Sequence, residues 1–152
     1  MKDLDLLRLE QVEDLVRFFR PLLTSQPPRT GWVRAIREAL GITNVQLAKR
    51  LNKRPQTIED MQKYEAHGTI KLQTLRELAD ALGCRLVYAI VPPKPLAEMR
   101  RDRALTLARY QMENVSHTMK LEAQGVSPAE EEKELQRLMT KLLMGNPKHL
   151  WD

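Results

Sequence analysis

The chain has 152 residues, which is long enough for one domain with a hydrophobic core and an appendage. Hydrophobic residues make up 42% and aromatic residues only 5%, a balance that favours a helical core over a sheet sandwich. The lone Cys84 excludes an internal disulfide, three scattered histidines give no zinc-ligand spacing, and no apolar run approaches the roughly 20 residues of a membrane span.

These features predict a cytoplasmic protein with no metal site and no cofactor. The N-terminal residues MKDLDLLRLE carry acids where a signal peptide would carry a basic start and an apolar run.

The first segment, residues 1–29, is expected to be a helical arm with a linker. Apolar residues recur at three- and four-residue spacing between Leu4 and Leu23, which indicates an amphipathic helix. Residues 24–30 are polar and proline-rich, as in a connection. The arm could pack on its own domain or on another chain.

Residues 30–92 are expected to form a compact domain of four short helices. The first covers residues 32–40, with Arg34, Arg37 and Glu38 pointing outward, and the last covers residues 72–82. The apolar stripes of the four helices predict one shared core, made of Ile36, Leu40, Leu47, Leu51, Ile58, Met61, Leu75, Leu78 and Leu82.

The two middle helices have the start and end signals of a helix-turn-helix. Thr43 can cap the first helix through its hydroxyl group, and Asn52 tolerates the left-handed conformation that ends a helix. Pro55 suits the first position of the second helix, where its missing N–H costs nothing. Residues 29–64 carry eight basic and three acidic side chains, a net charge of 8 − 3 = +5, as phosphate neutralisation requires.

In a helix-turn-helix, the first residues of the second helix face base edges in the major groove of double-stranded operator DNA. Three of those residues are predicted to contact the DNA there. Gln56 fits adenine, Thr57 can touch a thymine methyl, and Arg54 could pair with guanine or clamp a phosphate.

Three further basic residues, Lys49, Arg50 and Lys53, are better placed for phosphates. Glu59 and Asp60 are unexpected on a helix that approaches a polyanion. They either accept hydrogen bonds from cytosine or lie off the contact face, and we favour the second.

Residues 84–91 are expected to form the one strand of the chain. The run CRLVYAIV is rich in β-branched and aromatic residues and is bounded by Gly83 and by Pro92-Pro93. Because a single strand leaves its backbone groups unpaired, we expect the same strand of a second copy to pair with it in a homodimer ribbon.

Residues 93–152 are expected to form a helical hairpin appended to this domain. A seam of apolar residues runs along its first helix, comprising Leu105, Ala108, Met112, Val115 and Met119. The seam could lie in another protein's groove or fold back on its own chain. Ser127, Pro128 and Glu130 form a capping box that starts the second helix.

Three runs of the chain are similar to a known bacterial family: GWVRAIREALGITNVQLAKRL, TLRELADALGCRLVYAIVP and ARYQMENVSHTMKLEAQG. They resemble mobile mystery protein A, whose members have a helix-turn-helix of the phage-repressor (Xre/Cro) type. The resemblance covers about residues 20–125. Members of that family typically accompany mobile mystery protein B, a Fic-domain protein, so the resemblance implies an antitoxin paired with a Fic toxin.

Fic enzymes transfer AMP to a protein hydroxyl, and their inhibitors carry the pattern [Ser/Thr]-x-x-x-Glu-[Gly/Asn]. The glutamate pairs with the arginine that would hold the ATP γ-phosphate. Thr118 and Glu122 match this pattern, whereas Ala123 departs from its last position. Ser127 and Glu131 also fit, but Ser127 already serves as a cap, so the resemblance assigns the inhibitory role to Thr118 and Glu122.

Two functions therefore remain open, and a third is disfavoured. The first is an antitoxin that inhibits a Fic enzyme and represses its own operon. The second is a stand-alone repressor whose C-terminal helices serve oligomerisation or effector binding. An enzyme is disfavoured, because the sequence has no nucleophile–base constellation, no glycine-rich phosphate loop and no metal cluster.

Overall fold

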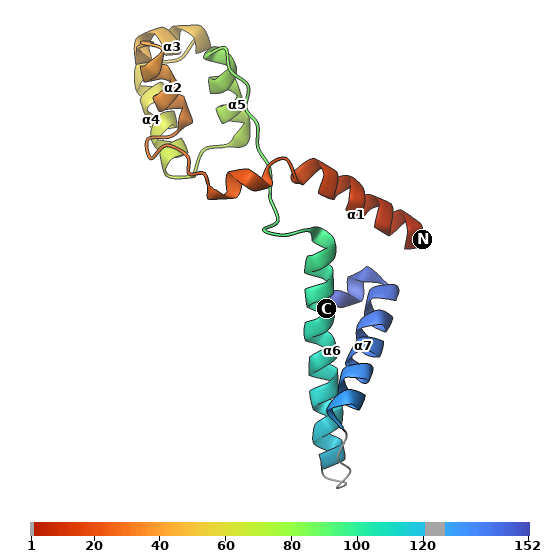
Figure 1. Cartoon of the computed structure of the whole chain (residues 1–152). Coiled ribbons are helices and arrows are strands. Elements are labelled where there is room, and N and C mark those ends of the chain that lie inside the picture. The colour runs from red at the N-terminus through yellow and green to blue at the C-terminus, as the bar shows by residue number, and fades with distance from the viewer. Residues whose placement is uncertain (1, 121–126) are drawn as a thin grey trace. The chain divides into compact units, whose positions relative to one another are not determined.

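The computed structural model describes residues 2–120 and 127–152, and the fold of these residues is mainly helical (Figure 1). The chain divides into two compact units. One comprises residues 22–90, and the other comprises residues 1–21 together with residues 91–152. No helix among the described residues is long and apolar enough to span a membrane.

The unit of residues 22–90 contains four helices, all of which the sequence predicts. They are α2 (Trp32–Ala39), α3 (Asn44–Leu51), α4 (Pro55–Ala66) and α5 (Leu72–Ala81), preceded by the 3-10 helix η1 (Arg20–Thr24).

The predicted ends of α3 are confirmed. The hydroxyl oxygen of Thr43 accepts a hydrogen bond from the amide of Gln46 (3.1 Å), and the Gln46 side chain accepts one from the Thr43 amide (2.8 Å). Asn52 ends α3 in the left-handed region, at φ 52°. Because each of these caps joins residues a few positions apart, the local sequence is enough to predict them.

The core of this unit is centred on Leu47, Ile58, Leu78 and Leu82, which are buried. The prediction that Leu40 lies in the core is wrong, because Leu40 is 58% exposed. Helix α2 ends at Ala39, so Leu40 occupies its C-cap and no longer follows the buried stripe. Val45, in the first turn of α3, is also exposed.

The start of α2 is capped by a side chain from a distant helix. Glu65 of α4 accepts hydrogen bonds from the amides of Trp32 (2.6 Å) and Val33 (3.1 Å). A carboxylate at this end of a helix also opposes the positive end of the helix dipole. Gly31 allows the approach, since its φ is +85° and a Cβ there would lie 2.7 Å from a Glu65 carboxylate oxygen.

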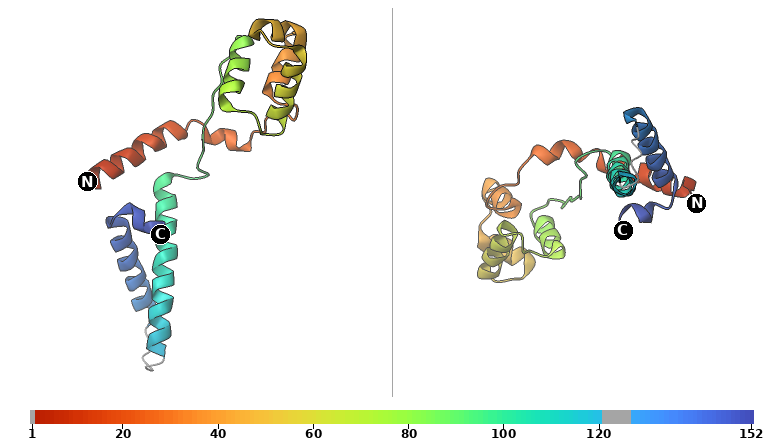
Figure 2. Two further views of the ribbon diagram at one scale, coloured as in Figure 1. Left: turned by 180° about the vertical axis from the view of Figure 1, so that it is seen from behind. Right: turned by 90° about the horizontal axis from the view of Figure 1, so that it is seen from below.

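The other unit contains α1 (Lys2–Val16), α6 (Leu96–Lys120), α7 (Pro128–Met144) and the 3-10 helix η2 (Pro147–Leu150). Helices α6 and α7 form the predicted hairpin and lie side by side in both views of Figure 2. The Ser127 capping box is confirmed. The Ser127 hydroxyl oxygen accepts a hydrogen bond from the Glu130 amide (3.3 Å), and the Glu130 carboxylate accepts one from the Ser127 amide (3.1 Å).

Part of the predicted apolar seam is used inside this hairpin. Ala108 is fully buried, Leu105 and Met112 are half-buried, and Val115 is exposed. Ala104 of α6 and Met139 of α7 are also buried, so the first half of the seam folds back on its own chain.

Helix α1 belongs to the same unit as α6, a pairing that the sequence left open. Glu13 joins them: one of its carboxylate oxygens accepts a hydrogen bond from the Leu96 amide at the start of α6 (3.0 Å). The other lies 2.8 Å from the Arg20 guanidinium, which also donates to the Pro92 carbonyl (3.2 Å). The hydrogen bond from the Leu96 amide and the bond to Arg20 hold the pKa of Glu13 below its usual range.

The prediction of a strand at residues 84–91 is wrong for the single chain, in which these residues have no regular structure. No backbone hydrogen bond joins residues 85–91 to the rest of the described chain. The composition favours an extended conformation, but a strand also needs a neighbour, and the described residues supply none. Three large apolar side chains are exposed here: Val87, Tyr88 and Ile90, the last at 92%.

The first testable prediction concerns the cap on α2. Glu65→Ala should lower the free energy of unfolding of this unit by about 1–2 kcal/mol, because it leaves two helix N–H groups without their partner. Glu65→Gln, which keeps an acceptor oxygen, should cost less. Denaturant titration followed by circular dichroism measures both.

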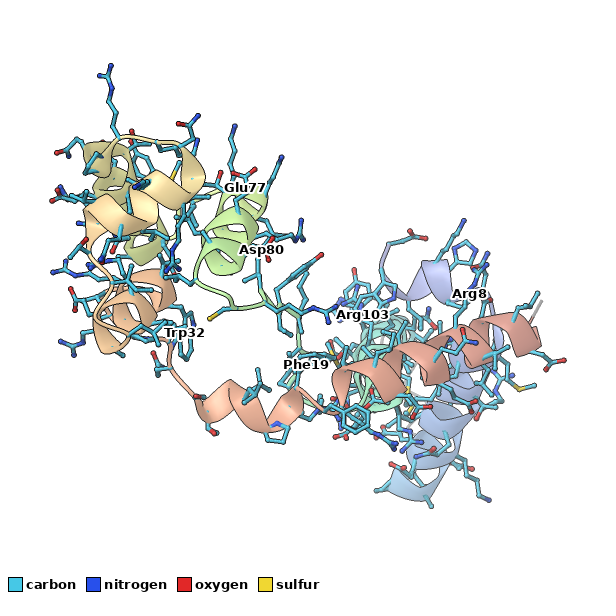
Figure 3. The ribbon with its side chains drawn as sticks, turned by 90° about the horizontal axis from the view of Figure 1, so that it is seen from above. Arg8, Phe19, Trp32, Glu77, Asp80 and Arg103 are labelled. Atoms are coloured by element: carbon cyan, nitrogen blue, oxygen red, sulfur yellow. The ribbon has the colours of Figure 1, made fainter. Side chains whose placement is uncertain are left out.

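The matched control is Glu77→Ala on α5, where the Glu77 carboxylate is exposed (Figure 3) and makes no ion pair or hydrogen bond in the described chain. It should leave the stability nearly unchanged. An equal loss in Glu65→Ala and Glu77→Ala would contradict the capping role.

The second prediction concerns Glu13. Because the pKa of Glu13 is lowered in the folded protein, its ionised form stabilises the attachment of α1 to α6. This stabilisation should be complete above the ordinary carboxyl pKa and should vanish as the pH falls through the lowered value. The protection factor of the Leu96 amide, which is its intrinsic exchange rate divided by the observed rate, should therefore fall in acid.

In Glu13→Gln this pH dependence should disappear, whereas Glu10→Gln on the exposed side of α1 should keep it. Identical exchange profiles for Glu13→Gln and the unchanged chain would rule out this role of Glu13.

Candidate DNA interface

The turn between α3 and α4 exposes the start of α4. The amide of Lys53 closes the end of α3 by donating to the Ala48 carbonyl (2.9 Å). Arg54 is the N-cap of α4, and its carbonyl accepts from the amides of Thr57 (3.0 Å) and Ile58 (3.3 Å). Ile58 is fully buried, so the inner side of α4 is anchored while its first residues face solvent.

The residues predicted to contact bases lie together at this exposed start. Arg54 and Gln56 are exposed, and Thr57 is half-buried. Lys53, in the turn, is also exposed. The arrangement places one guanidinium, one amide and one hydroxyl group within a single helical turn. These are the chemical groups that read base edges in a major groove.

The two predicted phosphate contacts on α3 differ from each other. Lys49 is exposed. Arg50 is also exposed, but its guanidinium donates to the Ala81 carbonyl at the end of α5 (2.9 Å). Arg50 therefore compensates the negative end of α5, so that only part of its hydrogen-bonding capacity is free for a phosphate.

A polar row continues along the solvent side of α4 from Gln56. It consists of residues spaced by three or four positions, which lie on one side of a helix: Gln56, Asp60, Lys63 and His67. The Gln56 amide nitrogen donates to an Asp60 carboxylate oxygen (3.1 Å), and Glu59 lies 3.4 Å from the Lys63 ammonium. Asp60 thus lies beside a predicted base-contacting residue, and the expectation that both acids lie off the contact face stays a prediction.

A buried chain of hydrogen bonds fixes α4 against α2 and α3. Arg37, only 9% exposed, donates to the Gln62 side-chain oxygen (3.1 Å) and to the Ile42 carbonyl (2.7 Å). Gln62 in turn donates to the Asn44 side chain (2.8 Å). The prediction that Arg37 points outward is therefore wrong, because periodicity cannot tell a solvated arginine from one with a buried partner.

Above this chain the surface has a basic depression of ≈ 380 Å³. Residues of α2, of α3, of α4 and of the segment before α2 line it: Arg29, Thr30, Arg34, Arg37, Asn44, Glu59, Gln62, Lys63, Ala66 and His67. Glu59 is the one carboxylate among these lining residues.

The depression extends the positive surface from the start of α4 toward its end. It suits an anion such as a phosphate, since its cations outnumber the single carboxylate. The Arg34 guanidinium also donates to Glu38 (2.8 Å), and this hydrogen bond lowers the pKa of the Glu38 carboxyl.

Sequence reasoning did not assign Arg29, Arg34 or Lys63 to the interface. Their charges contributed to the net +5 of residues 29–64, but a charge sum does not show which helix faces converge. The convergence depends on how α2 packs against α4.

Three predicted residues of the C-terminal segment cannot be placed. Glu122 lies outside the described residues, and so do the side chains of Thr118 and Met119. Among the described residues, no group of three or more histidine, cysteine or acidic side chains is placed to hold a metal ion.

Residues 33–88 match the family model described as helix-turn-helix. No curated protein and no solved structure matches the chain. The match covers α2 to α5 and therefore all of the candidate interface on α3 and α4. Residues 33–88 thus form an Xre/Cro-type helix-turn-helix domain, the kind that is typical of DNA-binding transcription regulators.

Proposed function

We propose that this protein is a transcription regulator that binds operator DNA with the start of α4 in the major groove. The observation that carries the proposal is the group at the start of α4, with Arg54 and Gln56 exposed and Thr57 half-buried, inside a domain that matches the helix-turn-helix family. A buried Ile58 anchors the same turn, so these side chains project from a fixed backbone.

Base contacts and backbone contacts have different residues in this proposal. Gln56 reads adenine, Arg54 reads guanine or clamps a phosphate, and Thr57 contacts a thymine methyl. Lys49 and Lys53 neutralise phosphates on the turn side of α4. The basic depression supplies a second electrostatic contact beside the C-terminal half of α4, which favours binding along an extended stretch of backbone.

A homodimer through residues 84–91 completes the proposal. Residues 85–91 have no backbone hydrogen-bond partner in the described chain, and Val87, Tyr88 and Ile90 expose apolar side chains. Both features favour β-pairing with another strand. An antiparallel pairing with the same segment of a second copy would give the backbone groups hydrogen-bond partners and would cover the apolar side chains. A twofold dimer would then read a palindromic operator, one half-site for each copy.

The antitoxin function stays a prediction from the resemblance to mobile mystery protein A. The matched family supports its helix-turn-helix part only. Inhibition of a Fic partner would depend on Thr118 and Glu122, for which the described residues give no side-chain geometry. A regulator without a Fic partner, whose α6 and α7 serve oligomerisation or effector binding, accounts equally for the described fold.

The third testable prediction separates base reading from phosphate contact. After selection of a preferred duplex from a randomised pool, Gln56→Ala should lose roughly 1–3 kcal/mol at one base position and little at the others. Lys53→Ala should instead weaken binding about equally for all sequences and reduce the salt slope by about 1. Fluorescence anisotropy at several salt concentrations measures both effects.

A uniform loss in Gln56→Ala would reassign Gln56 to the phosphate backbone. If the unchanged chain binds the selected duplex no better than a scrambled one, the proposed function is wrong.

The fourth prediction concerns the dimer. Val87→Pro removes a backbone N–H from the proposed pairing, so it should convert a dimer into a monomer at micromolar concentration. Val87→Thr keeps both the N–H and the β-branched side chain and should remain dimeric. Sedimentation or light scattering gives the masses, and a monomeric unchanged chain would exclude the dimer.

A further inference from the structure

An acidic residue lies directly beside the predicted adenine reader. Asp60 follows Gln56 by one helical turn on the solvent side of α4, and the Gln56 amide nitrogen donates to an Asp60 carboxylate oxygen (3.1 Å). Gln56 is exposed and Asp60 is half-buried. The acid is therefore the more firmly packed member of the pair, and it can act as the support of the other.

This hydrogen bond determines which way the Gln56 amide faces. A free glutamine can rotate about three bonds and can exchange the positions of its oxygen and nitrogen by turning its amide group. A carboxylate can only accept, so it draws the amide nitrogen and not the oxygen. One N–H of Gln56 remains for N7 of adenine, and the Gln56 oxygen remains for the adenine amino group.

The neighbouring acid has a different environment. Glu59 lies 3.4 Å from the Lys63 ammonium and lines the basic depression, one helical turn away from the exposed start of α4. Glu59 and Asp60 carry the same charge on the same helix, but only Asp60 contacts Gln56. This difference provides a matched pair of residues for an experiment.

We propose that Asp60 is a positioning residue for base recognition, which holds the Gln56 amide in the orientation that selects adenine. This inference rests on the proposed function. Fixing the amide before binding reduces the ordering cost when the base is engaged. The Asp60 carboxylate also repels phosphates, so it weakens the competing contacts that carry no sequence information.

The test measures discrimination, which is the ratio of dissociation constants for duplexes that differ only at the base pair read by Gln56. The full chain is used, with the preferred duplex and its three single-base variants. Asp60→Ala should lower this discrimination by about three- to tenfold, the factor expected for one side chain that is no longer pre-ordered. Asp60→Asn can accept or donate, so it no longer excludes the reversed Gln56 amide and should lose part of the discrimination.

Charge alone should have a separate effect. Asp60→Asn and Glu59→Gln each remove one negative charge and should both tighten binding to a scrambled duplex. Glu59→Gln should leave the discrimination at the Gln56 position unchanged, because Glu59 pairs with Lys63 and not with Gln56. Thermal unfolding midpoints equal to that of the unchanged chain confirm that the variants are folded.

A double variant shows whether Asp60 acts through Gln56. In Gln56→Ala, further replacement of Asp60 by Ala should not reduce discrimination again, because the positioned amide is already absent. A further loss would show that Asp60 contacts a base itself and would overturn the positioning role.

Full discrimination in Asp60→Ala, with loss in Gln56→Ala, would also overturn the inference while leaving the proposed function intact. Absence of sequence-selective binding by the unchanged chain would overturn both.

Discussion

The buried hydrogen bonds of Gln62 are the constraint on which the candidate interface depends. Gln62 accepts from Arg37 of α2 and donates to Asn44 of α3, so one side chain of α4 fixes the helix against two neighbours. Buried polar groups are costly when a partner is missing, so this arrangement tolerates few alternatives. The exposed start of α4 is held in place from beneath by these bonds and by Ile58.

Both units use a carboxylate from a distant helix to cap a helix start. Glu65 accepts from the first amides of α2, and Glu13 accepts from the first amide of α6. Each removes the need for a local capping side chain, and each joins two helices that are far apart in sequence. The free amides at a helix start thereby become tertiary contacts, which stabilise the packing of short helices with small apolar stripes.

Charge on α4 is organised by position along the helix. The start of α4, which we propose reads bases, has neutral polar groups and Arg54, and the Asp60 carboxylate there accepts a hydrogen bond from Gln56. The other end lines a depression in which the cations outnumber a single carboxylate. This separation is consistent with direct readout at one end and backbone attraction at the other, since specificity needs oriented donors and acceptors whereas affinity needs net charge.

The sequence by itself determined the helices of residues 30–92, their caps at Thr43 and Asn52, and the hairpin that starts at Ser127. These features depend on hydrogen bonds between residues a few positions apart, so their signals are local. It also located the exposed residues that start α4. Pro55 marks the first position of the helix, and the spacing of apolar residues shows which side of the helix is buried.

Only the tertiary structure decided that Arg37 is buried, that Leu40 is exposed, that α1 joins α6, and that Arg29, Arg34 and Lys63 line one depression. It also decided that residues 84–91 find no partner strand in the part of the chain that the structure describes. The reason is the same in each case. Side chains separated by tens of residues come into contact only when the helices pack. A local sequence pattern therefore does not show which partner a side chain will have.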